Sequence, residues 1–337
     1  MRLTVAPWGK SLAELVAVAR NAETAGAGTV WVSELHRSAP VPLAAIAGAT
    51  SDVRIGTAVA LAFVRSPMVT ALEAMDLDEL SGGRLVLGLG SGVRRLNEDW
   101  HHARWGRPVA HLRETVAAIR ELVARSHLGV PIELDGEHEP VRLRGFQRPF
   151  PPVRTAIPIF LAAVGPAMTR LAGEIGDGWI AHELGSPANL RDNVLPRLSE
   201  GLVRGGRSRS DLEVVASACC VPYADGGQAR RWAAGLVAFY ATVRTYEDFF
   251  AWHGFRGEAK AVQEAFRSGD ERGMVDAVPD AMVDALTLAG TPDEVAERLA
   301  GYEGLADAVK LSPPTRFVPP EATRAAQEGI LRLVAGS

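Results

Sequence analysis

Cysteine is nearly absent from this sequence, which has only two among its 337 residues, the adjacent pair Cys219 and Cys220. Neighbouring cysteines cannot link distant segments, so a disulfide framework is excluded and a reducing compartment is favoured. No segment reaches about 18 consecutive apolar residues, and the N-terminus shows no basic region followed by an apolar stretch and a small-residue cleavage site. We therefore expect a cytoplasmic protein that neither crosses a membrane nor carries a secretion signal.

The sequence also lacks an excess of basic charge. Lysine and arginine total 36, aspartate and glutamate total 40, and the net charge is -4. Nucleic acid requires a clustered basic surface and is therefore not an expected partner. Lysine is rare, with only Lys10, Lys260 and Lys310 beside 33 arginines. The 47% hydrophobic and 23% charged residues are typical of a folded globular protein and argue against disorder.

Short apolar segments rich in β-branched residues alternate with longer segments of helical periodicity, which is typical of parallel βα units. The expected strands cover residues 3–6, 28–33, 54–60, 84–89, 158–163, 178–182, 212–221 and 307–311. Eight repeats predict an α/β fold of the (β/α)₈ barrel type.

Helix starts are marked independently of this periodicity. A residue able to cap a helix stands before proline at four of them, where the missing N–H of proline costs nothing. These pairs are Ser66-Pro67, Gly165-Pro166, Ser186-Pro187 and Thr291-Pro292. Ser11 and Glu14 have the spacing of a capping box, as do Thr291 and Glu294.

Two segments are longer than a minimal βα unit requires. Residues 126–157 contain several prolines and an Asp-Gly pair. They predict a surface insertion, for which a hairpin is one form. Residues 226–290 predict an extra helical region rich in aromatic residues after the seventh strand. Because no linker or low-complexity segment interrupts the chain, we expect a single domain over residues 1–337.

An open, doubly wound sheet is the alternative fold, because the glycines of Gly88–Gly92 follow a strand and suggest a phosphate loop. That interpretation is weak, since the third glycine comes one residue early for the dinucleotide fingerprint and the segment belongs to the fourth unit instead of the first.

The most distinctive segment is Ser81–Gly92, with the sequence SGGRLVLGLGSG. Four other segments match in the same order along the chain: Arg54–Val59, Ala162–Pro166, Ala172–Gly178 and Gly290–Val295. Over nearly its whole length the chain thereby resembles the luciferase-like monooxygenases and their relatives that use the deazaflavin coenzyme F420. The third-strand segment and the long region after the seventh strand are more similar to the F420-dependent branch.

This resemblance implies where the cofactor lies. The deazaflavin ring would rest at the C-terminal mouth of the barrel, against a bulge after the third strand in which a non-proline cis peptide joins Ala58 and Val59. The phosphate and its chain would reach the start of the helix after the fifth strand, where unpaired N–H groups favour an anion. The implied contacts after the fourth and fifth strands are Ser91, Gly92, Asn97, Val164, Gly165 and Ala167, with Arg94 or Arg95 available for phosphate.

Hydride transfer leaves negative charge on the substrate, so the protein must supply a proton donor. Histidine suits this role, and His36 follows the second strand close to Glu34. The resemblance implies that Glu34 touches the cofactor ring and that His36 is catalytic, although Leu35 separates two residues that are adjacent in relatives. Several relatives also carry a glutamate after the fourth-strand glycine pair; Val93 replaces it here, which argues against a sugar-phosphate substrate.

Other polar residues at strand ends are weaker candidates. Trp8 and His182 are expected to line the substrate pocket. Glu98, His101 and His102 lack the spacing of a ligand set, so no metal is expected. Lys310, in the eighth strand, is interpreted as a structural or cofactor-facing lysine more readily than as a Schiff-base residue.

The sequence therefore predicts an F420-dependent oxidoreductase that transfers a hydride between the coenzyme and a small to medium organic molecule. An FMN-dependent monooxygenase is the alternative, because FMN has nitrogen at ring position five and can activate oxygen. A barrel without cofactor and without redox activity is the third possibility. The family resemblance also implies a homodimer.

Overall fold

Eight parallel strands form a closed barrel in the computed structural model, which describes all 337 residues. The barrel strands are β1 (Arg2–Val5), β2 (Thr29–Val32), β3 (Arg54–Thr57), β5 (Leu85–Gly90), β8 (Ile159–Ala162), β9 (Gly178–Ile180), β10 (Glu213–Pro222) and β12 (Ala308–Ser312). The barrel closes because β10 pairs with both β9 and β12, and β12 pairs with β1. The predicted (β/α)₈ barrel is confirmed, and the open, doubly wound alternative is wrong.

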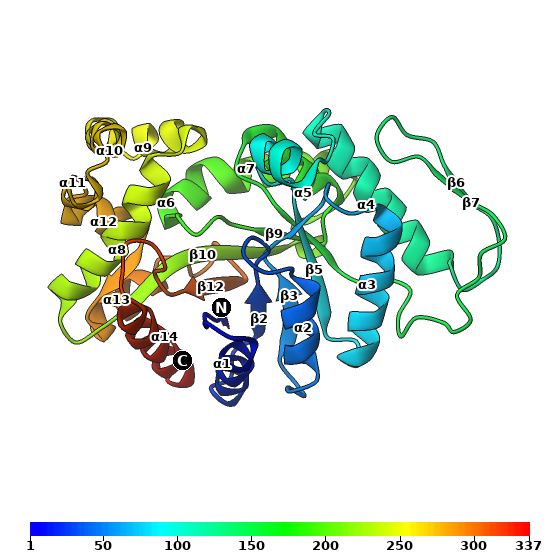
Figure 1. Cartoon of the computed structure of the whole chain (residues 1–337), viewed down its shortest axis with the longest axis horizontal. Helices are drawn as coiled ribbons and strands as arrows, with labels where there is room; N and C mark the ends of the chain where they lie inside the picture. The colour runs from blue at the N-terminus through cyan, green and yellow to red at the C-terminus, as the bar shows by residue number, and fades with distance from the viewer.

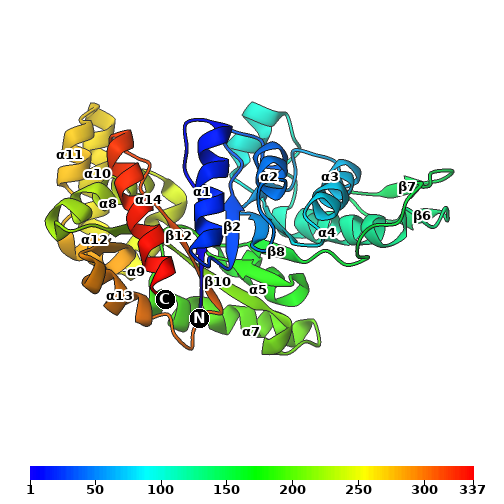
Figure 2. The same cartoon turned by 90° about the horizontal axis from the view of Figure 1, so that it is seen from below.

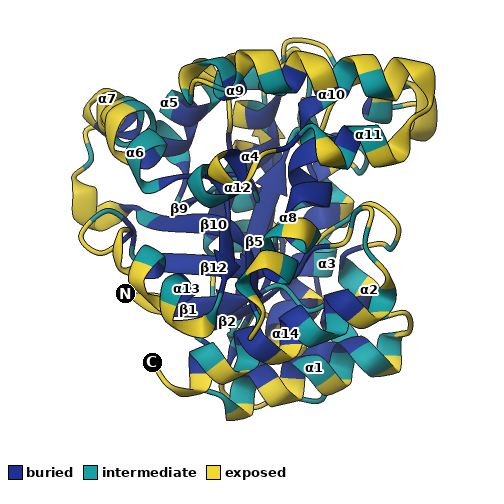
Figure 3. Ribbon diagram, turned by 90° about the vertical axis from the view of Figure 1, so that its left-hand side faces the viewer, coloured by how far each residue is buried: buried dark blue, intermediate teal, exposed yellow.

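Helices cover the outside of this barrel (Figure 1, Figure 2). They are α1 (Leu12–Thr24), α2 (Pro40–Ala47), α3 (Pro67–Leu80), α4 (Pro108–Arg125), α5 (Pro166–Ile175), α6 (Pro187–Asn189), α7 (Leu195–Arg204), α13 (Pro292–Ala300) and α14 (Pro320–Ala335), with π-helical turns at Leu96–Trp100 and Leu190–Val194 and a 3₁₀ turn at Arg209–Asp211. Figure 3 shows the strands as a buried centre, while the outer helix faces are exposed. The main core lies between strands and helices.

The predicted helix starts are confirmed. The hydroxyl groups of Ser66, Ser186 and Thr291 each accept a hydrogen bond from the backbone N–H three residues later. The hydroxyl of Ser11 does the same, but its expected capping box is incomplete. The Glu14 carboxylate accepts from the N–H of Lys10 at 2.6 Å instead of reaching Ser11.

The segment 126–157 contains the antiparallel hairpin of β6 (Ile132–Leu134) and β7 (Val141–Leu143). The hairpin projects away from the barrel in both Figure 1 and Figure 2. The predicted insertion after the fourth barrel strand is therefore confirmed.

The region after β10 is mainly helical, as predicted. It comprises α8 (Gly226–Ala241), a 3₁₀ turn at Arg244–Tyr246, α9 (Glu247–Trp252), α10 (Arg256–Ser268), α11 (Glu271–Asp276) and α12 (Asp280–Leu286). Its end differs from the prediction, because β11 (Leu288–Gly290) is a short strand that pairs with Cys220–Pro222 of β10. Phe250, Met282 and Leu286 belong to a separate apolar core in this region.

Large aromatic side chains fill the barrel interior. The rings of Trp31 and Phe160 lie 6.1 Å apart, and both residues are at most 2% exposed. Two glycines make room for them: a Cβ on Gly56 would lie 2.5 Å from the Trp31 ring, and one on Gly178 would lie 2.6 Å from the Phe160 ring. The Trp31 indole N–H donates to the Thr4 hydroxyl at 3.0 Å, so its polar atom is satisfied.

A charge cluster closes the N-terminal end of the barrel. The Glu213 carboxylate accepts two hydrogen bonds from Arg54, at 3.0 and 2.7 Å, and pairs with Arg2 at 2.8 Å. Burial favours the neutral form of Glu213, but the arginines outweigh burial and lower its pKa. With this end closed, a ligand of the barrel must approach the carboxyl ends of the strands.

Candidate active site at the carboxyl ends of the strands

A bulge interrupts the third barrel strand. The sequence predicted one strand over residues 54–60, but β3 ends at Thr57 and the chain rejoins the sheet as β4 (Ala60–Leu61). The peptide bond between Ala58 and Val59 is cis, as predicted. The Thr57 hydroxyl donates to the Gly88 carbonyl at 2.6 Å and accepts from the Gly88 N–H at 2.8 Å. A side chain therefore replaces backbone pairing between the strands where the bulge begins.

The glycines of β5 are explained by this bulge. A Cβ on Gly88 would lie 1.8 Å from the Thr57 carbonyl oxygen, and one on Gly90 would lie 2.6 Å from the Val59 side chain. Glycine at these two positions leaves room for the bulge to pack closely against β5. The glycine-rich segment that suggested a phosphate loop thus has a packing role at Gly88 and Gly90.

Glu34, in the loop after β2, supports the bulge through hydrogen bonds. Its carboxylate accepts from the Leu61 N–H at 2.9 Å and from Arg65 at 2.8 Å, and its side chain is only 7% exposed. Burial favours the neutral form, but these donors lower the pKa of Glu34. Glu34 is therefore ionised at neutral pH. His36 lies two residues further in the same loop and is exposed to solvent.

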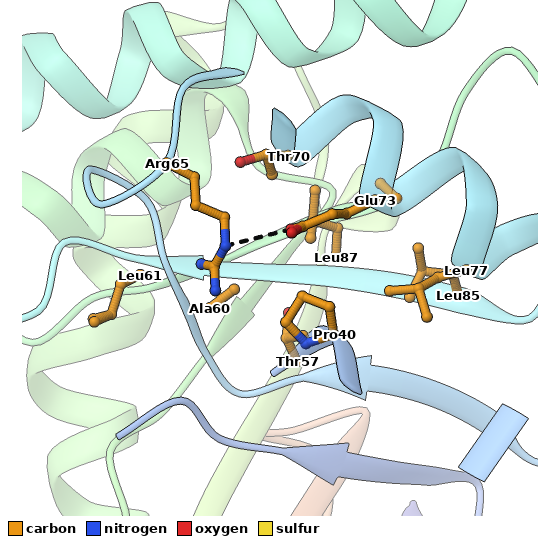
Figure 4. A pocket seen from close by; sticks show the side chains of 11 residues that line it. Pro40, Thr57, Ala60, Leu61, Arg65, Thr70, Glu73, Leu77, Leu85 and Leu87 are labelled. Atoms are coloured by element: carbon orange, nitrogen blue, oxygen red, sulfur yellow. Dashed lines mark ion pairs between the residues drawn. The ribbon is translucent and has the colours of Figure 1, made fainter. Parts of the chain in front are cut away.

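Arg65 also pairs with Glu73, at 3.4 Å, across a small cavity outside the barrel wall (Figure 4). The cavity measures about 20 Å³ and is lined by Thr57, Thr70 and leucines of α3 and β5. Burial raises the pKa of Glu73. A space of this size holds about one water molecule, so it belongs to the support of the bulge and cannot take a cofactor.

The loop after β8 and the start of α5 lie open to solvent. Val164, Gly165 and Ala167 are all exposed. Gly165 occupies the N-cap of α5 and has no side chain to accept from the first N–H groups of the helix. Uncapped N–H groups and the positive end of the helix dipole together favour an anion. This start of α5 fits a phosphate group.

The loop after β5 is held from beneath by Asn97. Asn97 is fully buried, and its side-chain N–H₂ donates to the carbonyls of Ser91 at 2.8 Å and Val93 at 3.0 Å. Gly92 is exposed with a φ of +64°, a conformation that favours glycine. Ser91 is partly exposed. Ser91 and Gly92 thus lie at the surface of the loop, whereas Asn97 lies behind it.

Other predicted residues of this loop stay in solvent. Arg94 and Arg95 pair with Glu98 and Asp99 on the same turn, at 2.8 and 3.4 Å. His101 and His102 are exposed beside them. Both arginines can exchange these exposed partners for a phosphate group, because exposed ion pairs contribute little to stability.

His182 follows β9 and packs between two tyrosines. Its ring lies 4.3 Å from that of Tyr240 and 4.6 Å from that of Tyr246. Its Nδ1 accepts from the Leu184 N–H at 3.1 Å, which leaves the proton on Nε2. Burial, with a smaller effect from the charge of Lys310, lowers the pKa of His182 to about 3. His182 is therefore a neutral donor at physiological pH.

The two tyrosines were not predicted as site residues. Burial, followed by the charge of Glu183, raises the pKa of Tyr240 and of Tyr246. Both hydroxyl groups therefore stay protonated. The sequence predicts this aromatic run as part of the extra helical region, and only the contact with His182 across the fold identifies these two residues.

Trp8 lies at the rim, on the side of α14. Its backbone N–H donates to Gln327 at 2.7 Å, and the Arg324 guanidinium lies 5.5 Å from the centre of its ring. Both partners belong to α14. Trp8 therefore shares no contact partner with His182, which packs against the two tyrosines.

The fold and the polar groups at the carboxyl ends of its strands define a barrel enzyme, and comparison with known proteins identifies its family. Residues 2–308 match the luciferase-like monooxygenase family. The chain is 33% identical over 318 residues to a putative coenzyme F420-dependent oxidoreductase of Mycobacterium tuberculosis, covering 88% of this chain and 89% of that protein.

Two solved structures show similar folds. The coenzyme F420-dependent tetrahydromethanopterin reductase of Methanopyrus kandleri has a TM-score of 0.85 at 23% identity, covering 99% of this chain and 97% of the other. The oxygenating constituent of 3,6-diketocamphane monooxygenase from Pseudomonas putida, in complex with FMN, has a TM-score of 0.69 at 18% identity, covering 100% and 99%.

The chain belongs to the luciferase-like monooxygenase family, in the branch of the F420-dependent oxidoreductases. It is an oxidoreductase of the kind that uses a deazaflavin or flavin cofactor. None of its helices combines the length and the apolar character needed to cross a membrane.

Proposed function

We propose that the protein is an F420-dependent oxidoreductase that transfers a hydride between the deazaflavin coenzyme and a small to medium organic substrate. The observation that carries this proposal is the exposed and uncapped start of α5, which follows β8 and is separated by β5 from the bulge after β3. The relative named for F420, at 33% identity over most of both chains, supports the choice of cofactor.

The chain offers a separate contact for each part of the cofactor. The N–H groups of Val164, Gly165 and Ala167 would bind its phosphate, with Arg94 or Arg95 as a second cation. Ser91 and Gly92 would contact the chain between phosphate and ring, and Asn97 would hold their loop in place. Ala58 and Val59 would support the ring from one face. When bound, F420 supplies a hydride at the carbon in ring position five.

Glu34 and His36 would have different roles. Because Arg65 keeps Glu34 ionised, Glu34 cannot donate a proton and is proposed to position the bulge that supports the ring. His36 remains the proposed proton donor, since it is exposed after β2 and an imidazole side chain can both donate and accept a proton. His182 would line the substrate side of the site as a neutral donor.

The cellular setting and assembly are part of this proposal. Cys219 and Cys220 are free and buried, in agreement with a reducing cytoplasm. Val41, Val69 and Leu80 on α2 and α3 are between 44% and 58% exposed, and they offer apolar surface for a homodimer. Size-exclusion chromatography with light scattering would measure the oligomeric state.

Parallel titration of the purified protein with F420 and FMN, each oxidised and reduced, tests the cofactor. Tryptophan fluorescence and the cofactor's own fluorescence report binding. We expect F420 to bind with a Kd of about 1 μM or lower and FMN at least about a hundredfold more weakly. If the protein instead prefers FMN, the proposed reaction becomes that of an FMN-dependent monooxygenase. If it binds neither cofactor, the proposal of a redox function fails.

A further inference from the structure

Lys310 is a buried cation without a protein partner. It lies on β12 and is only 4% exposed. Ala308, two residues earlier, packs inside the barrel with Trp31 and Phe160, whereas Val309 and Leu311 belong to the outer core. Side chains alternate along a strand, so Lys310 points into the barrel. Its ammonium group forms neither a salt bridge nor a hydrogen bond with the protein.

A second group on the same face of β12 is also unsatisfied. The Ser312 hydroxyl is buried and has no hydrogen-bond partner. Ser312 is two residues beyond Lys310 and therefore points to the same side, closer to the carboxyl end of the strand. Buried polar groups are nearly always hydrogen-bonded. The Ser312 hydroxyl is enclosed without a partner, whereas the ammonium group of Lys310 keeps some accessible surface, so a ligand that reaches both groups would supply their acceptors.

Donor groups surround His182, which is close enough to Lys310 for the two to interact through charge. The hydroxyls of Tyr240 and Tyr246 form no hydrogen bond within the protein, and Nε2 of His182 carries a proton. The nearby anion is Glu183, which acts on Lys310 through its charge but forms no salt bridge with it. The site thus contains one cation, one anion beyond salt-bridge distance and several neutral donors, and the unpaired cation favours a ligand group that is rich in acceptors and negatively charged.

We propose that Lys310 and Ser312 bind a carboxylate group of the substrate. The proposal rests on the proposed function for the location of the cofactor. Three strands separate β12 from β5 in either direction around the barrel: β1, β2 and β3 on one side, and β10, β9 and β8 on the other. Lys310 therefore faces the bulge and the β5 loop across the barrel, so a substrate held by its carboxylate would lie against the proposed cofactor.

The scarcity of lysine gives a direct test. Protein labelled with ¹³C and ¹⁵N only in lysine contains three labelled side chains, Lys10, Lys260 and Lys310. Signals are assigned with Lys310→Arg and Lys260→Arg. Benzoate is the anionic probe, and benzamide, which has nearly the same shape, is the neutral one. Both are titrated into the full chain, with and without saturating F420, and the side-chain signals are followed by NMR.

We expect benzoate to shift the Lys310 signal alone and to bind about tenfold or more tightly than benzamide. Lys310→Met should remove this preference, Lys310→Arg should retain part of it, and the matched variant Lys260→Met on the exposed face of α10 should bind as the wild type does. Ser312→Ala should weaken benzoate binding about threefold.

Three results would overturn the proposal. Benzoate could leave the Lys310 signal unmoved, or it could bind Lys310→Met as well as the wild type. F420 alone could shift the Lys310 signal and abolish the effect of benzoate, which would assign the cation to the carbonyl oxygens of the cofactor. Cofactor fluorescence separates these results from failure of the proposed function: a protein that binds benzoate through Lys310 but neither F420 nor FMN would keep the anion site and lose the redox role.

Discussion

Charged side chains form salt bridges at the N-terminal end of the barrel, whereas one buried lysine toward its carboxyl end forms none. At the N-terminal end, Glu213 is matched by Arg2 and Arg54, and the aromatic plug of Trp31 and Phe160 lies directly above. At the carboxyl end, Lys310 is more deeply buried than any of these three charges but has no partner. Proteins satisfy buried charges where only stability is at stake, and departures from this rule concentrate at functional sites. The difference indicates that one end stabilises the fold and the other binds ligands.

Gly88→Ala should have the largest effect on stability, because the added methyl group would lie at the most crowded glycine, near the carboxyl ends of the strands. The added methyl group would lie 1.8 Å from a backbone oxygen that cannot move without the bulge. We expect the free energy of unfolding to fall by about 3 kcal/mol in urea denaturation. Gly48→Ala is the matched control, since its methyl group would meet nothing nearer than 3.7 Å. Equal stability of the two variants would refute the packing role of Gly88.

Glu213→Gln should break the closed end. The change leaves Arg2 and Arg54 without their counter-charge, and we expect a loss of about 2 kcal/mol, reduced by the partial exposure of the arginines. Glu200→Gln, which removes an exposed partner of Arg170, should be nearly neutral.

The effect of Glu213→Gln should also depend on pH. Because the folded state lowers the pKa of Glu213, its contribution is complete above the unfolded value of about 4.3 and is lost as the pH falls through the folded value. Wild type and variant should therefore converge in acid. A stability difference that stayed constant between about pH 7 and pH 2 would argue against the charge pairing.

Gly165→Asp should weaken the binding function of the open end without harming the fold. An aspartate would cap α5 and place a negative charge where the phosphate is proposed to bind. Space is available, since a Cβ at this position meets no atom within 4 Å. We expect F420 affinity to fall about tenfold by fluorescence titration. Gly165→Asn, a neutral cap of the same shape, is the control and should lose distinctly less affinity.

Lys310→Met should have the smallest effect on stability and the opposite sign to Glu213→Gln. Replacing a buried cation that has no salt-bridge partner by an apolar side chain should stabilise the protein by about 1 kcal/mol at neutral pH, since the charge of Glu183 only partly offsets burial. Burial lowers the pKa of Lys310, so its penalty is complete below the folded value and disappears as the pH rises toward the unfolded value of about 10.4. The gain should therefore shrink in alkaline urea titrations. A less stable variant at neutral pH would show that Lys310 has a protein partner after all.

Much of the fold could be predicted because its signals are local. Apolar periodicity identified all eight barrel strands, and cap residues before proline identified the helix starts. The strand predicted over residues 54–60 failed at Ala58 because bulge geometry depends on Gly88 and Gly90, about thirty residues away in the chain.

The site was harder to predict for the same reason. Resemblance to the family located the bulge and the start of α5, but not the direction of each side chain. The Glu34 carboxylate accepts a hydrogen bond from Arg65, and the backbone N–H of Trp8 donates to Gln327 of α14. Lys310 was noticed in the sequence, yet its lack of a partner becomes visible only when strands from both ends of the chain are adjacent. Tertiary contacts decide such roles, and no local pattern records them.

The aromatic plug in the lower barrel also constrains kinetics. With Trp31 and Phe160 blocking the interior, two ligands that occupy the barrel must enter and leave through one opening. In the proposed function, cofactor and substrate would therefore share one route, and exchange of either would depend on whether the other is bound. This coupling of exchange would be a consequence of how the bottom of the barrel is packed, far from any reacting atom.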